Sequence, residues 1–408
     1  MTKQPSYRFV GFEDEWKEKY LYEVLKVSKD RNVDLAYDKN QVLSVSREAG
    51  VVNQIEYQGR SFAGADLSNY KIVNKENLIY TKSPLKGAPY GIFQISYTTG
   101  IVSPLYAVFK STKQIFAPFV GLSLTDDNKA SKYLSPIVTK GAKNTINITD
   151  EGSLQGKLLF PSILEQTIMH TFFQDIDQLI SIQQRKLEVL KEQKKTYLKL
   201  LFPAKGQTKP DLRFAGFEDE WKEKYLYEVL KVSKDRNVDL AYDKNQVLSV
   251  SREAGVVNQI EYQGRSFAGA DLSNYKIVNK ENLIYTKSPL KGAPYGIFQI
   301  SYTTGIVSPL YAVFKSTKQI FAPFVGLSLM DDNKASKYLS PIVTKGAKNT
   351  INITDEGSLQ GKLLFPSMEE QRIIHTFFQD LDKSIAKQEE KVNQLKESKQ
   401  TLLRKMFI

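Results

Sequence analysis

RFVGFEDEWKEKYLYEVLKV, residues 8–27, returns as RFAGFEDEWKEKYLYEVLKV at residues 213–232, and this repetition organises the whole chain. The match continues, so that residues 8–162 recur as residues 213–367 at an offset of 205. A repeat of this length is a folded domain and not one unit of a solenoid. The stretches that follow each copy agree at only about half of their positions.

The chain is therefore expected to alternate domain, helix, domain and helix. Its 408 residues, 41% of them hydrophobic, provide enough apolar material for two cores. The segment PAKGQTKPDL has no periodicity and is typical of a linker. The predicted boundaries are 1–162 for the first domain, 163–202 for a central helix, 203–212 for the linker, 213–367 for the second domain and 368–408 for a C-terminal helix.

Composition narrows the classes of function. A formal net charge of +12 points to a polyanionic partner such as DNA, although a membrane surface or ribosomal RNA fits the charge equally well. The absence of Cys excludes disulfides and thiolate metal sites, and two His residues make a zinc site unexpected. No run approaches the roughly 20 apolar residues of a membrane span, so we expect a cytoplasmic protein without membrane contact.

Within each module, β-rich runs are separated by Gly, Pro and Asn clusters. The runs are QVLSVS, NLIYTK, GIFQISY and LYAVFK. They predict an α/β fold with mixed α+β, strand-rich modules. The opening stretch EDEWKEKYLYEVLKV predicts a short helix with Trp16, Tyr20 and Leu21 toward the core.

The two divergent stretches predict long helices with one apolar seam each, because apolar residues recur at steps of three and four. The seam residues are Phe173, Ile176, Ile180, Leu187, Leu190 and Leu201 in the first helix and Phe378, Leu381, Ile385, Val392, Leu395 and Leu402 in the second. Packing the seams together removes them from water, at roughly 0.8 kcal/mol per buried methylene. We expect an antiparallel coiled coil that relates the modules by a pseudo-two-fold axis; the alternative is a solvated face that merely bends inward.

Catalytic signatures are missing from the sequence. GSLQGKLL has the wrong spacing for a phosphate-binding P-loop, and no motif of a methyltransferase or nuclease is found. Asp126 and Asp127 are interpreted as a solvated turn, and His170 and His375 as packing or capping residues. The sequence therefore predicts a binding protein and scaffold, not an enzyme.

Basic, amide and aromatic side chains on the predicted loops are the candidate DNA contacts. Arg and Lys neutralise phosphates, and Arg, Gln and Asn can read purine edges in the major groove. The first-module candidates are Lys29, Arg31, Arg47, Gln54, Tyr57, Arg60, Lys82, Lys86, Tyr90, Lys140, Lys143 and Asn144. Their copies are Lys234, Arg236, Arg252, Gln259, Tyr262, Arg265, Lys287, Lys291, Tyr295, Lys345, Lys348 and Asn349.

The arrangement resembles the specificity (S) subunits of type I restriction-modification systems, over nearly the whole chain. The resemblance is carried by the module opening, by GIVSPLYAVF and above all by the junctions LLFPSILEQTIMHTFFQDIDQLI and LLFPSMEEQRIIHTFFQDLDKSI. The junction residues that match the family pattern are Pro161, Glu165, Gln166, Ile168, Phe172 and Asp177, repeated as Pro366, Glu370, Gln371, Ile373, Phe377 and Asp382.

The resemblance implies two target recognition domains, each reading one half of a bipartite site on double-stranded DNA. It also implies that two modification subunits, which use S-adenosylmethionine to methylate adenine N6, bind this chain. Two restriction subunits, which use ATP and Mg, would complete the assembly. No cofactor is expected on this chain itself. A stand-alone, tandem-domain nucleic-acid-binding protein is the alternative interpretation.

The near-identity of the two modules departs from the family pattern of two different readers. Identical readers related by a pseudo-two-fold axis should read the same half-site on opposite strands, which predicts an interrupted palindrome. Helices of about 38 residues rise roughly 57 Å at 1.5 Å per residue, which is close to 17 bp of DNA. We therefore expect two short half-sites around an unread spacer whose length depends on the helices.

Overall fold

The computed structural model describes residues 4–85, 87–112, 117–140, 146–290, 292–318, 320–345 and 351–407. Its contacts divide the chain into a first unit, Met1–Arg185 with Glu389–Ile408, and a second unit, Lys186–Gln388. Each unit holds one module together with parts of both long helices. This division cuts both helices, whereas the repeat boundaries treat each helix as a segment of its own.

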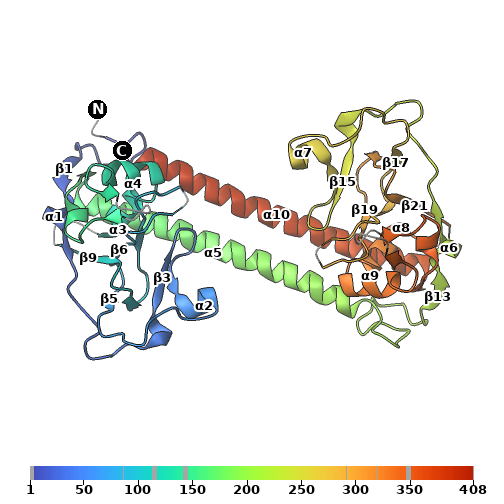
Figure 1. Cartoon of the computed structure of the whole chain (residues 1–408), viewed down its shortest axis with the longest axis horizontal. Helices are drawn as coiled ribbons and strands as arrows, with labels where there is room; N and C mark the ends of the chain where they lie inside the picture. Colours follow the sequence, from blue (N-terminus) through green and yellow to red (C-terminus); the bar gives the residue numbers. More distant parts are fainter. Residues whose placement is uncertain are drawn as a thin grey trace. The chain divides into compact units, whose positions relative to one another are not determined.

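The first module is built from short strands and short helices, coloured from blue to green in Figure 1. Its elements are β1 (Lys17–Tyr20), α1 (Leu21–Val24), β2 (Leu25–Val27), η1 (Lys39–Gln41), β3 (Leu43–Ser46), β4 (Gly50–Asn53), α2 (Gln54–Gln58), β5 (Lys71–Val73), β6 (Leu78–Tyr80), β7 (Phe93–Ile95), β8 (Gly100–Val102), β9 (Ala107–Ser111), α3 (Ala117–Ser123), α4 (Asp127–Leu134), β10 (Thr139–Lys140), β11 (Ile146–Asn147), η3 (Gly152–Leu154) and β12 (Lys157–Phe160).

The second module repeats this order. Its elements are β13 (Lys222–Tyr225), α6 (Leu226–Val229), β14 (Leu230–Val232), η4 (Lys244–Gln246), β15 (Leu248–Ser251), β16 (Gly255–Asn258), α7 (Gln259–Gln263), β17 (Lys276–Val278), β18 (Leu283–Tyr285), β19 (Phe298–Ile300), β20 (Gly305–Val307), β21 (Ala312–Ser316), α8 (Ala322–Ser328), α9 (Asp332–Leu339), β22 (Thr344–Lys345), β23 (Ile351–Asn352), η6 (Gly357–Leu359) and β24 (Lys362–Phe365). The long helices are α5 (Ile163–Leu200) and α10 (Met368–Met406).

A four-stranded antiparallel sheet, in the order β2-β9-β6-β7, forms the centre of the first module. Leu78 and Tyr80 of β6 face the main core, whereas Ile79 between them faces a smaller cluster on the opposite side of the sheet. A strand buried on both faces needs a continuous apolar run, and NLIYTK supplies one. The four strands predicted from the β-rich runs are confirmed as β3, β6, β7 and β9.

Helix α3 covers one face of this sheet, as Figure 1 shows. A Cβ at Gly121 would lie 2.4 Å from Cγ1 of Ile95 on β7, so only a residue without a side chain permits this close packing. Asp126 caps the next helix, α4, by accepting hydrogen bonds from the N–H groups of Asn128 and Lys129, both at 3.0 Å. The interpretation of Asp126 and Asp127 as a solvated turn was therefore wrong, because together they begin a helix.

The predicted opening helix is also largely wrong. Residues 17–20 form strand β1, which pairs with β12, and the helix that follows is only the four residues of α1. Trp16 and Leu21 are buried as expected, but Tyr20 is 36% exposed. Lys17, Glu18 and Lys19 are exposed or half-buried, as charged residues of an edge strand are, and the pairing with β12 prevails over helix propensity.

The long helices run antiparallel inside the first unit. Asp177 of α5 accepts hydrogen bonds from Nζ of Lys399 on α10 at 2.6 and 2.8 Å. Four residues earlier on α5, the ring of Phe173 lies 6.0 Å from the ring of Phe407, just beyond the end of α10. The direction is antiparallel because the residue number falls on one helix as it rises on the other.

The second unit shows the same direction. Lys194 of α5 pairs with Asp382 of α10 at 2.6 Å, and Tyr197 packs against Phe377 with ring centroids 5.1 Å apart. The predicted seam residues are buried or half-buried at every position on both helices. Within the described ranges, no helix is both long and apolar enough to cross a membrane.

The predicted linker is hydrogen-bonded to its own unit. The N–H of Leu212 donates to the carbonyl of Leu200 at 2.9 Å, and the N–H of Trp221 donates to the carbonyl of Thr208 at 3.0 Å. The first unit repeats the former contact, with the N–H of Tyr7 donating to the carbonyl of Lys405 at 3.0 Å. In each unit, the segment that opens the module is therefore hydrogen-bonded to the end of a long helix, which is α10 in the first unit and α5 in the second.

Candidate nucleic-acid interface

The hairpin β3–β4 and the helix α2 form a polar surface on the first module. Ser46 pairs with Gly50 across the hairpin, and Gly50 has a φ of +72°, which favours glycine at this turn. Asn53 ends β4 and caps α2, because its Oδ1 accepts from the N–H groups of Ile55 and Glu56 at 3.0 and 3.2 Å. The chain thus turns directly from strand into helix, which places α2 beside the hairpin.

Gln54 fixes this arrangement. Its Nε2 donates to Oγ of Ser44 at 3.0 Å, and its Oε1 accepts from the N–H of Phe62 at 2.6 Å and from Oγ of Ser61 at 3.2 Å. Both ends of the amide are engaged within the module. Gln54, predicted as a DNA contact, therefore acts here on the position of α2 and of the loop that follows it.

Arg47 lies at the tip of the hairpin and pairs with Asp127 at the start of α4. Gly87 supports the guanidinium, since a Cβ at Gly87 would lie only 2.8 Å from Nη1 of Arg47. Arg47 and Asp127 are 37% and 25% exposed. An ion pair this accessible contributes little stability, so Arg47 can exchange its partner for another anion or a base edge at small cost.

Between the hairpin, α2 and the residues Leu85 and Gly87 lies an open hollow of about 600 Å³, which we call the hairpin hollow. Its lining residues are Ser44, Val45, Ser46, Arg47, Glu48, Tyr57, Gln58, Leu85 and Gly87. Oγ of Ser46 and the hydroxyl of Tyr57 are 3.3 Å apart. Hydroxyl, amide, guanidinium and carboxylate groups give the hollow both donors and acceptors, the combination needed to read base edges.

The second module repeats these contacts. Arg252 pairs with Asp332, Nε2 of Gln259 donates to Oγ of Ser249 at 3.0 Å, and Tyr262 lies 3.3 Å from Oγ of Ser251. The sequence-predicted residues Arg47, Gln54 and Tyr57, and their copies, are thus brought together around one surface in each module.

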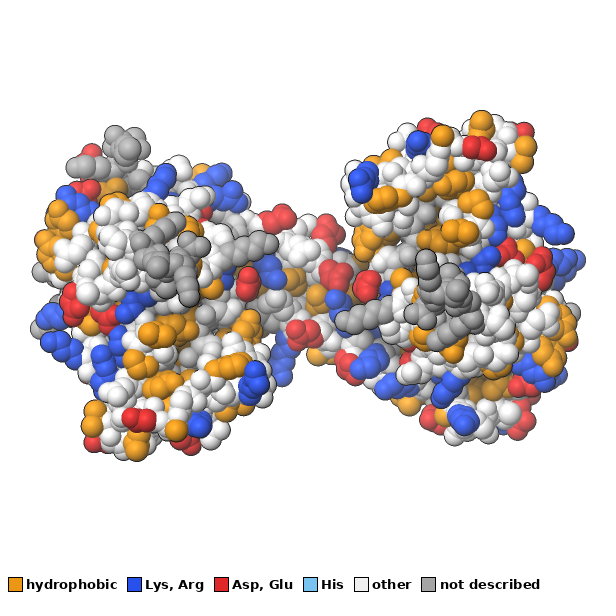
Figure 2. Space-filling view, in the orientation of Figure 1, with side chains coloured by type: hydrophobic (Ala, Val, Ile, Leu, Met, Phe, Trp, Pro, Cys, Tyr) orange, Lys and Arg blue, Asp and Glu red, His pale blue; other side chains and the backbone are white. Residues whose placement is uncertain are grey.

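Other predicted contacts lie elsewhere in the module. Arg60 and its copy Arg265 stack over the exposed rings of Phe62 and Phe267 at 4.7 and 4.6 Å. Lys29 and Lys234 are exposed; Tyr90 and Tyr295 are half-buried and pack against the cores. Figure 2 shows basic and apolar side chains interspersed near α2, at the lower right of the first unit.

Several predicted residues lie outside the described residues. These are Lys86, Lys143 and Asn144 of the first module and Lys291, Lys348 and Asn349 of the second. Lys140 and Lys345 end described strands, but their side chains lie outside the described part. Their role in DNA binding stays a prediction.

Lys82 belongs to a half-buried ion cluster that the sequence did not predict, and Arg31 pairs in a β-bridge with another member of it, Lys71. Nζ of Lys82 donates to Oδ1 of Asp150 at 2.6 Å, and the nearly buried Lys71 binds the other oxygen of the same carboxylate. Burial acts to raise the pKa of Asp150, but the two lysines outweigh it and hold this pKa below its ordinary value. Lys276, Lys287 and Asp355 repeat the arrangement.

The junction residues that carry the family resemblance have structural contacts. Glu165, 1% exposed, accepts from Nε and Nη2 of Arg8 at 2.7 and 2.8 Å. Nε2 of Gln166 donates to the carbonyl of Pro161 at 3.0 Å. His170 is buried and stacks on Tyr97 with ring centroids 6.1 Å apart, which fits the packing interpretation. In the described part of the chain, no group of three or more His, Cys, Asp or Glu side chains could hold a metal ion.

Comparison with solved structures shows what this fold resembles. The S subunit of a type I restriction-modification system from M. genitalium superposes with a TM-score of 0.58 at 12% sequence identity, covering 99% of both chains. A type I restriction-modification structure described in terms of complex assembly and conformational transition gives 0.49 at 14% identity, with 98% and 99% covered. The HsdS subunit from Thermoanaerobacter tengcongensis gives 0.44 at 13% identity, with 97% of each chain covered.

No family model and no curated protein matches the chain. The likeness to the M. genitalium subunit extends over the full length of both chains, including both modules and both long helices. The chain therefore has the fold of a type I S subunit.

Proposed function

We propose that this chain is the DNA-specificity subunit of a type I restriction-modification complex. The S-subunit fold supports the proposal, and the observation that carries it is the polar surface around the hairpin hollow, whose residues and contacts recur in the second module. Each module presents Arg47, Tyr57 and the two serines, or their copies, on a surface whose groups match the donors and acceptors of base edges. The net charge of +12 favours the polyanionic partner.

The chain itself performs no chemistry under this proposal. Modification subunits carrying S-adenosylmethionine would methylate adenine N6 at the site that this chain selects. Restriction subunits carrying ATP and Mg would add translocation and cleavage. Two copies of each would fit two modules, and the long helices are the candidate scaffold on which they assemble in the cytoplasm.

Identical reading surfaces should select identical half-sites. The residues around the hollow are the same in both modules, and their contacts repeat. We therefore propose that the site is an interrupted palindrome, with the same half-site on opposite strands and an unread spacer between.

Single-molecule methylome sequencing tests the proposal directly. DNA would be taken from cells that express this chain with its modification subunit, and from cells that express the modification subunit alone. An interrupted palindrome carrying N6-methyladenine on both strands, only when both subunits are present, is the expected result. An asymmetric motif would contradict equivalent use of the modules, and no chain-dependent motif would favour the stand-alone nucleic-acid-binding protein.

A further inference from the structure

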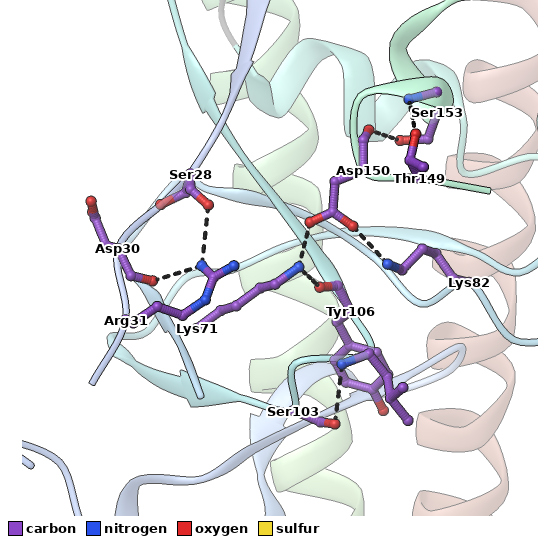
Figure 3. Close-up of polar contacts among 12 residues, drawn as sticks. Ser28, Asp30, Arg31, Lys71, Lys82, Ser103, Tyr106, Thr149, Asp150 and Ser153 are labelled. Carbon is purple, nitrogen blue, oxygen red and sulfur yellow. Dashed lines mark hydrogen bonds and ion pairs between the residues drawn. The ribbon is translucent and has the colours of Figure 1, made fainter. Parts of the chain in front are cut away.

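Three cationic side chains and one carboxylate meet in each module, in a place that base reading does not use. Figure 3 shows Lys71 at the centre, with Arg31 beside it on one side and Lys82 on the other. Nζ of Lys71 binds Asp150 and donates to the carbonyl of Tyr106 at 2.5 Å. We call Arg31, Lys71, Lys82 and Asp150 the basic cluster.

Several strands bring the cluster together. Arg31 and Lys71 face each other in an isolated antiparallel bridge, which explains why their side chains run alongside one another. Lys82 follows β6 and has a φ of +50°, a strained value for a residue with a side chain. Asp150 lies just before η3, whose Ser153 donates to the carbonyl of Asp150 at 2.7 Å. Bridge pairing and hydrogen bonds therefore hold Arg31, Lys71 and Asp150 in place.

The charges within the cluster do not balance. Lys71 and Lys82 share the carboxylate of Asp150, and the guanidinium of Arg31 adds a third positive charge that acts on Lys71. Burial is the largest influence on the pKa of Lys71 and lowers it. Asp150 opposes this effect, and the positive charges of Lys82 and Arg31 lower the pKa further, so that it lies below its ordinary value. Gathering like charges in a half-buried site is unfavourable unless an anion offsets the excess.

The accessible side chains of the cluster are those that could reach such an anion. Lys71 is 4% exposed, whereas Lys82 is 19% exposed. Arg31 is half-buried, and its Nη1 donates to the main-chain carbonyls of Asp30 and Ser28 at 3.2 and 3.5 Å. These carbonyls hold the guanidinium without neutralising it.

The cluster also lies close to the hairpin hollow along the chain. Lys82 and Leu85, which lines the hollow, are three residues apart, so their Cα atoms are at most about 11 Å apart. If the bases of a duplex approach the hollow, we expect the phosphates of the same duplex to lie close enough to be reached by Lys82. Phosphate contacts beside a reading surface are the usual means of fixing its register on DNA.

We propose that the basic cluster binds a phosphodiester group of the DNA backbone through Arg31 and Lys82, and through Arg236 and Lys287 in the second module. Lys71 and Asp150 act as positioning residues that hold Lys82 in place. This inference rests on the proposed function, because it takes the ligand to be the DNA read by the neighbouring hollow.

Salt dependence of binding provides the test. Each phosphate contact contributes about 0.9 to the slope of log affinity against log salt, so the two modules together contribute about 1.8. The full-length K82Q/K287Q variant keeps Arg31 and Arg236 and should therefore lose part of that slope, up to about 1.8, which makes its affinity up to about 12-fold less sensitive to salt between roughly 50 and 200 mM. The probe is a fluorescent duplex carrying the motif found by methylome sequencing, measured by anisotropy with the modification subunit present.

The matched control is the K157Q/K362Q variant. Lys157 and Lys362 are also lysines paired with a carboxylate, Glu18 or Glu223 at 3.0 Å, and the change in net charge is the same. The control should keep the slope of the original chain. If K82Q/K287Q and K157Q/K362Q lost the same amount of slope, the loss would come from the change in net charge alone, and the inference would be overturned.

A second variant keeps the salt-dependence test possible if the first variant does not fold. If K82Q/K287Q unfolds, R31Q/R236Q takes its place, since the carbonyl contacts of Arg31 involve no buried ion pair. A folded variant with an unchanged slope overturns the inference while leaving the proposed function standing. Failure of the unmodified chain to select any duplex would instead overturn the proposed function.

A Tm measurement with inorganic phosphate distinguishes a cluster that binds the DNA backbone from one that binds a free phosphate ion. At constant ionic strength, replacing chloride with phosphate should shift the Tm of the original chain and of K82Q/K287Q equally, since one isolated phosphate lacks the rest of the duplex interface. A Tm increase seen only in the original chain, together with an unchanged salt slope for DNA, would assign the cluster to a free phosphate and overturn the inference.

Discussion

Arg8 and Glu165 form a bidentate ion pair that joins the opening segment of the first module to the start of α5. Nε and Nη2 of Arg8 donate to the two carboxylate oxygens at 2.7 and 2.8 Å, and Glu165 is 1% exposed. Arg213 and Glu370 repeat the pair in the second unit, with both distances 2.8 Å. Parallel hydrogen bonds of this kind fix orientation as well as distance.

Replacement of Arg8 by Met should destabilise the first unit by about 3–5 kcal/mol, because it leaves the Glu165 carboxylate buried without its partner. Hydrogen exchange at residues 163–170 should accelerate, whereas exchange at residues 368–375 in the second unit should not. The intact second copy is thus an internal control. The double variant R8M/E165M should recover most of the loss, and equal exchange in both helix starts of R8M would contradict the role assigned to the pair.

The second prediction concerns His375, whose pKa is lowered to about 4 by burial, with Arg372 lowering it further and Asp382 opposing. The unfolded chain binds a proton near pH 6.5, but the folded chain does not until about pH 4. This contribution to stability is therefore fully present above pH 6.5 and is lost as the pH falls toward 4, amounting to at most about 3 kcal/mol because solvent screens part of the imidazole.

The measurement is hydrogen exchange in the second unit at pH 7.5 and pH 5, corrected for intrinsic exchange rates. The H375Q variant should show a smaller difference in stability between the two pH values than the original chain. Carboxylates titrate in both proteins, so the comparison isolates the imidazole. Identical pH dependence in the two proteins would show that His375 is solvated and has an ordinary pKa.

The third prediction uses the duplication to test base reading by Arg47. Substituting R47A in the first module alone should relax one base position in one half-site, because a bidentate Arg–base contact is worth about 1–3 kcal/mol of discrimination. The methylome motif should then become asymmetric, and R47A/R252A should restore the palindrome with that position relaxed in both halves. A motif unchanged in all variants would exclude Arg47 from base reading. D127N is the control for the ion pair, and it should leave the motif intact.

Local patterns in the sequence predicted most of the fold but few of its tertiary contacts. NLIYTK became a buried central strand because a continuous apolar run carries its own signal. The helix APFVGLS, α3, was not predicted, since Pro118 and Gly121 argue against a helix in a segment of seven residues. Its stability comes from packing against the sheet, which no local pattern records.

The candidate site shows the same limit. Arg47, Tyr57 and Gln54 were predicted from a basic and aromatic loop, and they lie around one hollow or support it. The partners Asp127 and Asp150 were not predicted, because they lie far along the chain from Arg47 and Lys71. Only the folded chain brings such pairs together.

The last prediction concerns spacer length. Removing seven residues from α5 and seven from α10 shortens each helix by about 10 Å, equivalent to about 3 bp of DNA, at 1.5 Å per residue. A seven-residue deletion preserves the seam, because apolar residues in a coiled coil repeat every seven. The methylome motif should therefore keep both half-sites and lose about 3 bp of spacer, since both modules are untouched. A matched control removes seven residues from α5 alone, which breaks the correspondence between the helices and should abolish methylation. Altered half-site letters in the double deletion would contradict the assignment of base reading to the modules and of spacing to the helices.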